Sequence, residues 1–409
     1  MNNLVFYKYA PNNNKDLEFE DFHTDSIHDA EVQFFTLRKE YFYSMFDENY
    51  NIVTNQNDIA ELDSFCLVLG FDDSFRQLFE LIERDDFNQL IQSNRDKIKK
   101  IVFWEMDTDW TNFTGREYDA KIKKFKSYFK QLSIPYKIFS TALKFNYDDS
   151  VGYFAAQNAM TMAKLLGEMN TNDYYEYNLN GDKTKYFYSA ANSINTDRLH
   201  FYKFIDDNNL WNKNNISLFS TYKNMELSAG FNYSKIVYEY NKGKGGIYEI
   251  DDDYTFYPHP FEDEEFKTMD YKLLTNLRRY GSSLFEMIFE TMYEACENKI
   301  IQTSEKLLKP FAQKKAFLTF SYKGILNEFK QLGFKTFDYV FYEGYDEFDN
   351  HSDRLYSVLN QYKNICSRDI NELKEIVKEN NHIIEHNYSN LLLLMDKFKS
   401  DIKKEVTYE

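Results

Sequence analysis

The sequence has few cysteines, prolines and glycines, and each shortage excludes a class of protein. Its three cysteines, among 409 residues, lie far apart and fit neither a disulfide framework nor a cysteine zinc site. We therefore expect a reducing compartment. Five prolines and 13 glycines argue against long flexible linkers. The chain is thus typical of a folded protein that is not held together by disulfides.

Long apolar runs are also missing. No stretch approaches the roughly 20 apolar residues of a spanning helix, so we expect no membrane span. The N-terminal apolar run is too short for a signal peptide and is followed by Lys8. These two observations predict a cytoplasmic protein.

The chain has fewer basic than acidic residues. The chain has 49 Lys and Arg against 66 Asp and Glu, which gives a net charge of -17. Such a surface repels polyanions, so nucleic acid and anionic membranes are not expected as main partners. A small phosphate ligand remains compatible, because a few local cations are enough to bind it.

Aromatic residues, in contrast, are abundant: 38 Phe and 34 Tyr can fill a large core. In the first part of the chain, apolar runs at 4–10, 64–71, 100–106 and 136–141 alternate with helical patterns such as the basic stretch 118–133. This alternation predicts a parallel sheet with helical crossovers.

A second α/β series follows. Strand patterns occur at 185–190, 215–221 and 315–320, and residues 280–294 mix strand and helix signals. From about residue 350 the pattern is helical, and this segment either folds back over the rest or forms an oligomer contact; we favour the fold-back. The predicted parts are two α/β domains, 1–150 and 151–350, and a helical extension, 351–409.

Ligands of open α/β sheets bind beyond the carboxyl ends of the strands. Polar residues follow the predicted strands at four places, and these are the candidate site residues: Glu105, Asp107 and Asp109; Asn192 and Arg198; Glu290; and Glu305 with Lys306.

Glu305 and Lys306 open a predicted helix. The free N–H groups of a helix start attract anions, a lysine adds positive charge, and a glutamate accepts hydrogen bonds from paired hydroxyls such as those of ribose. The alternative is a capping box with Thr303 or Ser304 as the cap. Arg198 offers a planar fork for phosphate, and its alternative is a solvated position on a helix face.

Two segments resemble the donor-binding half of α1,3-fucosyltransferase-like enzymes. In SSLFEMIFETMYEACENKIIQTSEKLLKPFAQKKAFLTFS, residues 289–291 match an F-E-N-S type element and residues 304–307 match a T-E-K-L type element. In YFYSAANSINTDRLHFYKF, a strand, a polar loop with Asn192 and a helix with Arg198 follow the same order. The end of this region, to about residue 350, is similar to phage and giant-virus glycosyltransferase-like proteins.

The resemblance implies a GT-B-like fold, in which two Rossmann-like α/β domains face each other across a cleft. Residues 1–150 would form the acceptor-side domain and residues 151–350 the nucleotide-sugar-binding domain. The resemblance also implies roles. Arg198 and Lys306 would neutralise the donor diphosphate, Glu305 would bind the ribose, Glu290 would lie near the donor sugar, and Asn192 would belong to the donor loop. Because fixed cations replace a metal in this scheme, we expect no cofactor beyond the nucleotide sugar.

The expected reaction is inverting transfer of a sugar to a hydroxyl acceptor such as a carbohydrate. The base is a carboxylate of the first domain, and we assign it to Glu105, Asp107 or Asp109, which Trp104 and Trp110 flank. The alternative for these acids is a polar strand-to-helix connection. A second set of candidates lies at His23, Asp25 and His28.

Departures from the family pattern keep other functions open. The sequence F-E-T-M occurs where the family has F-E-N-S, and TFSYKG occurs where the family has Gly-x-Pro. One alternative is therefore a non-catalytic virion or structural protein on a degenerate transferase fold. Another is a phage DNA-base glycosyltransferase that uses the basic helix, and a phage protein would work in the host cytoplasm. No metal site is expected, since His382 and His386 lack a third ligand.

Overall fold

The structure is a computed structural model. The structure describes residues 2–9, 50–53, 56–71, 80–105, 115–140, 142–145, 150–152, 182–191, 196–218, 231–232, 255–256, 277–290, 300–302 and 305–407.

The chain forms two compact units, and neither is continuous in sequence. The first comprises Met1–Thr161, Met292–Leu308 and Leu392–Glu409, and the second comprises Met162–Thr291 and Lys309–Leu391. The boundaries predicted from the sequence, near residues 150 and 350, instead divide the chain into consecutive parts.

The main sheet of the first unit is parallel throughout the strands that the structure describes. Its order is β2-β1-β3-β4-β5-β7. The strands are β1 (Asn2–Tyr9), β2 (Tyr50–Val53), β3 (Phe65–Phe71), β4 (Ile98–Glu105), β5 (Tyr136–Ser140) and β7 (Ser150–Gly152). The four strands predicted in this part of the chain are confirmed.

A small antiparallel pair in the same unit joins distant segments. β6 (Ala142–Phe145) pairs with β13 (Ile300–Gln302). The return of residues 300–302 to the first unit is one reason why the two units interleave along the chain.

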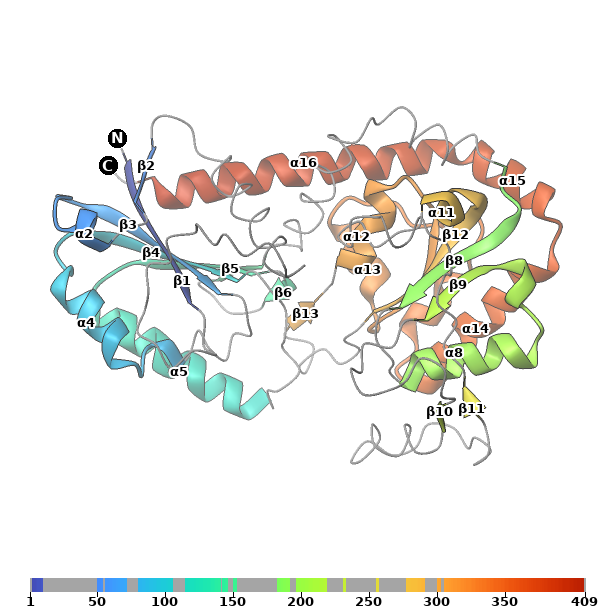
Figure 1. The fold of residues 1–409 in the computed structure, drawn as a ribbon, viewed down its shortest axis with the longest axis horizontal. Helices are drawn as coiled ribbons and strands as arrows, with labels where there is room; N and C mark the ends of the chain where they lie inside the picture. Colours follow the sequence, from blue (N-terminus) through green and yellow to red (C-terminus); the bar gives the residue numbers. More distant parts are fainter. Residues whose placement is uncertain are drawn as a thin grey trace. The chain divides into compact units, whose positions relative to one another are not determined.

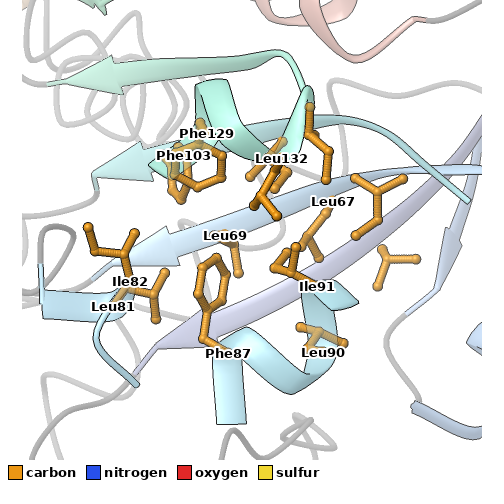
Figure 2. Close-up of a cluster of buried hydrophobic side chains, with 14 of the residues drawn as sticks. Leu67, Leu69, Leu81, Ile82, Phe87, Leu90, Ile91, Phe103, Phe129 and Leu132 are labelled. Atoms are coloured by element: carbon orange, nitrogen blue, oxygen red, sulfur yellow. The ribbon is translucent and has the colours of Figure 1, made fainter. Parts of the chain in front are cut away.

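Helices α4 (Asp85–Ser93) and α5 (Gly115–Leu132) supply apolar faces to the core of this unit, and α2 (Gln56–Ile59) is a single turn. Figure 2 shows Phe87, Leu90 and Ile91 of α4 against Leu67 and Leu69 of β3. The period of apolar residues in α4 and α5 is helical, so one face of each is buried.

The second unit contains another parallel sheet, of order β14-β12-β8-β9. Its strands are β8 (Lys185–Ala191), β9 (Asn215–Leu218), β12 (Ser283–Phe289) and β14 (Phe317–Phe320). All seven residues of β12 are buried, as expected of a central parallel strand covered on both faces. The two-residue strands β10 (Phe231–Asn232) and β11 (Thr255–Phe256) pair separately.

Aromatic side chains fill both faces of this second sheet. On one face Phe187 of β8 stacks on Tyr362, with ring centroids 4.3 Å apart, and on the other Phe311 stacks on Phe334 at 4.1 Å. The helices of this unit include α8 (Thr196–Asp207), α11 (Leu277–Ser282), α12 (Glu305–Ala312), α13 (Ile325–Gln331), α14 (His351–Ser367) and α15 (Ile370–Glu379), with 3-10 turns η1 (Trp211–Lys213) and η2 (Glu343–Glu347). The first residues of α12, up to Leu308, count with the first unit.

The last helix, α16 (Asn381–Val406), contributes to both units (Figure 1). In the second unit Asn387 exchanges hydrogen bonds with the backbone of Lys335, at 2.8 Å in each direction. In the first unit Phe398 packs on Phe139, with ring centroids 6.1 Å apart. The predicted fold-back of this segment is therefore confirmed. Among the described helices, none combines the length and apolar character needed to cross a bilayer.

Candidate functional site

Two of the predicted site residues meet at the carboxyl end of β12. The Nη2 group of Arg198 donates a hydrogen bond to the carbonyl of Phe289 at 3.1 Å. Glu290 follows directly, and its backbone N–H donates to the carbonyl of Phe320, at the end of β14, at 3.0 Å. Segments that are distant in sequence thus converge at the position where parallel sheets bind ligands.

Local packing explains this convergence. α8 begins at Thr196, so Arg198 belongs to its first turn, and Phe201 one turn later packs on the ring of Phe289 at a centroid distance of 4.8 Å. The apolar contact holds the helix start beside the strand end, where the long arginine side chain reaches the carbonyl.

Arg198 and Glu290 are both buried, each with a relative exposure of 1%. The alternative of a solvated arginine on a helix face is therefore wrong. A guanidinium is always charged and carries five donors, only one of which faces the Phe289 carbonyl in the contact above. The side chain thus places fixed positive charge behind the strand ends.

A second layer of polar residues supports this pair, and the sequence analysis missed it. His351, at the start of α14, has Nε2 2.9 Å from Oδ1 of Asp197 and Nδ1 3.5 Å from Nη2 of Arg354. Arg354 also donates from Nε to the carbonyl of Ser321 at 3.1 Å. Two features of the sequence could have indicated this layer. One is Asp197, next to Arg198, and the other is the charged sequence HSDR (351–354) that follows Asn350, the N-cap of α14.

Two titratable groups near these strand ends are perturbed by burial. Desolvation lowers the pKa of His200 to about 4, with Asp197 opposing the shift, so the imidazole is neutral at pH 7. Desolvation also raises the pKa of Asp346 to about 6, although its Oδ2 accepts a hydrogen bond from the N–H of Leu326 at 2.9 Å.

A separate buried ionic cluster lies on β12 itself. Lys309 and Glu286 form an ion pair of 2.9 Å, both side chains under one-tenth exposed, and Tyr280 donates its hydroxyl to Glu286 at 2.8 Å. Lys315 donates to the carbonyls of Tyr280 and Ser283, and burial lowers its pKa well below the usual range. These bonds join α11 and α12 to the sheet.

Lys306 lies in the first turn of α12 and is half-buried. Glu305 begins that helix, but its side chain lies outside the described part of the structure, as do Thr303 and Ser304. The choice between a ligand site and a capping box at this turn stays a prediction.

The side chains of the remaining candidates lie outside the described part of the structure. Glu105 is the last residue of β4, the position expected of a residue at a ligand-binding sheet edge, and its side chain is not described. Asp107, Asp109 and Asn192 lie outside the described residues, and so do the three second-choice candidates for the base.

The basic helix α5 does not present a run of free cations. Lys124 pairs with Glu83 at 2.6 Å and Lys121 with Glu80 at 3.6 Å. Among the described residues, no group of three or more His, Cys, Asp or Glu side chains has the arrangement of a metal site.

Comparison with known proteins gives distant likenesses. No protein family model and no curated protein matches the sequence. The structure is similar to a crystal structure of α1,3-fucosyltransferase with GDP-fucose, at 9% identity and a TM-score of 0.36, over 90% of this chain and 81% of that one. A second α1,3-fucosyltransferase structure gives 12% identity and a TM-score of 0.29, over 90% and 80%. Likeness at this level does not assign a function.

Proposed function

We propose that the chain is a glycosyltransferase that binds the diphosphate of a nucleotide sugar at the carboxyl end of the second sheet. One observation carries the proposal: Arg198 and Glu290, from two segments that resemble the family's donor-binding elements, meet at the end of β12. A buried arginine beside parallel strand ends supplies the positive charge that a leaving diphosphate requires.

In the proposed reaction, the acceptor hydroxyl oxygen attacks the anomeric carbon while the bond from that carbon to the diphosphate oxygen breaks. A carboxylate takes the hydroxyl proton, and a single displacement of this kind inverts the anomeric centre. The candidates for this base are still Glu105, which ends β4, and Asp107 and Asp109, which follow it in the sequence. Lys306 would add charge to the phosphates from the start of α12.

A structure determined with GDP or UDP tests the proposal. We expect diphosphate oxygens at the carboxyl end of β12, with Arg198 the nearest arginine and Glu290 beside the ribose or the sugar position. A nucleotide bound elsewhere, or none at millimolar concentration, would exclude the proposal and favour the non-catalytic alternative.

The DNA-base alternative is supported less well. It needs a basic groove, and two of the lysines that it would use on α5 pair with glutamates. We expect the chain to show no salt-dependent DNA binding. Such binding, abolished by charge reversal at Lys121, Lys123 and Lys124, would favour this alternative instead.

A further inference from the structure

A closed ring of contacts surrounds the candidate donor residues in the second unit. Arg354 of α14 holds the carbonyl of Ser321, after β14, and lies beside His351. His351 bonds to Asp197, whose neighbour Arg198 holds the end of β12. The backbone N–H of Glu290, which follows β12, donates to the carbonyl of Phe320, beside Ser321.

The central link of the ring is the hydrogen bond between His351 and Asp197, and the chemistry of Arg354 identifies its donor. An arginine only donates, so Nδ1 of His351, which faces Nη2 of Arg354 at 3.5 Å, acts as the acceptor. A neutral imidazole with an accepting Nδ1 carries its proton on Nε2, and this proton is donated to Oδ1 of Asp197 at 2.9 Å. The carboxylate therefore receives a bond that a hydrophobic residue at 351 cannot supply.

Two members of the ring are buried, while the side chain of His351 is 27% exposed. Asp197 and Arg354 are 5% and 4% exposed, so water does not compete for their bonds, and the ring of Phe320 packs edge-on against His351 at 4.9 Å. The ring joins the starts of α8 and α14 to the ends of β12 and β14. His351 is therefore linked to Arg198 through a single residue, Asp197.

We propose that His351 and Asp197 are positioning residues, which hold Arg198 at the orientation needed to bind the diphosphate of a nucleotide sugar. This role rests on the proposed function, since it specifies what orients the donor-binding arginine. The effect of His351 is indirect, acting through Asp197 on the first turn of α8.

The test compares GDP affinity by calorimetry in the full-length chain. His351→Leu and Asp197→Ala each break the central link, and we expect each to weaken binding about tenfold, because a displaced binding group loses its contact geometry. The double variant should lose no more than either single variant, since one link is broken in all three. His351→Gln, whose amide N–H takes the place of Nε2–H, should retain affinity within about twofold. Asp207→Ala is the control, since it breaks the exposed Lys203–Asp207 pair on the same helix.

Additive losses in the double variant, or equal losses in His351→Gln and His351→Leu, would overturn the proposal. Amide hydrogen exchange of residues 200–203, whose N–H groups face the carbonyls of the first turn of α8, gives a second readout that needs no nucleotide. We expect faster exchange there in His351→Leu and in Asp197→Ala, but not in Asp207→Ala. If the wild-type chain binds no nucleotide, the proposed function fails. Hydrogen exchange that is the same in His351→Leu, Asp197→Ala and the wild type would separately overturn the positioning role of His351 and Asp197.

Discussion

Arg198 combines full burial with a permanent charge, and any substitution there tests both properties. Lysine keeps the charge but replaces a planar fork by a point donor. We expect Arg198→Lys to weaken nucleotide binding by about 1.5–3 kcal/mol, the contribution of a charge-assisted hydrogen bond. Calorimetry with GDP and UDP measures this loss. Unchanged affinity would remove Arg198 from the site and leave it a role in packing alone.

Asp346 makes stability depend on pH. Its pKa is about 6 in the folded chain against an ordinary 3.8, so the folded state binds the proton more tightly than the unfolded state does. The stability that this provides is complete below the unfolded pKa and is lost as pH rises through about 6. Asp346→Asn, which cannot ionise, should therefore gain about 2–3 kcal/mol on the wild type between pH 4 and pH 7.5.

Urea unfolding at both pH values measures this change. Asp349 provides a matched control from the neighbouring loop, because Lys323 lowers its pKa and its linkage has the opposite sign. A constant difference between Asp346→Asn and the wild type would contradict the assignment.

At the scale of elements, the buried pair between α12 and β12 is the sharpest test of packing. Lys309→Met leaves Glu286 as an uncompensated buried charge, which should cost about 3–5 kcal/mol of unfolding free energy. Adding Glu286→Leu removes that charge and should restore a large part of the loss. The exposed Lys203–Asp207 pair is the control, and breaking it should cost less than about 1 kcal/mol. If the double variant is as unstable as Lys309→Met, the unpaired charge of Glu286 is not the cause of the lost stability.

The same strand shows how far sequence reasoning reaches. Buried parallel strands such as β3, β4 and β8 were predictable because each is a short apolar run between turn signals. The segment containing β12 gave mixed signals, because Glu286 interrupts the apolar run and its partner Lys309 comes from another element. An ion pair between two separate elements leaves no local pattern in the sequence.

The site was predictable to the same limited extent. Arg198 and Glu290 could be selected because they follow predicted strands, and the structure brings them to one strand end. Asp197 and His351 could not be paired from the sequence, since 154 residues separate them. The orientation of a supporting layer depends on tertiary contacts alone.

At the scale of the whole molecule, α16 makes the C-terminal residues part of the first unit. Phe398 is 3% exposed there, so Phe398→Ala should lower the stability of the first unit by about 3–5 kcal/mol. Leu393, 67% exposed on the same helix, provides the control, and Leu393→Ala should have little effect. Hydrogen exchange of β3 and β4 during urea unfolding reports on this unit. Equal effects of the two substitutions would contradict the assigned packing.

The central claim, that the second unit binds a nucleotide sugar through its diphosphate, is tested most directly by calorimetric titration of the full-length chain with GDP and with UDP. The account predicts saturable binding to one of them with a Kd below about 1 mM, the upper end of common substrate affinities. It also predicts that high salt weakens this binding, because fixed cations hold the phosphates. The absence of binding heat for both nucleotides at millimolar concentration would contradict it.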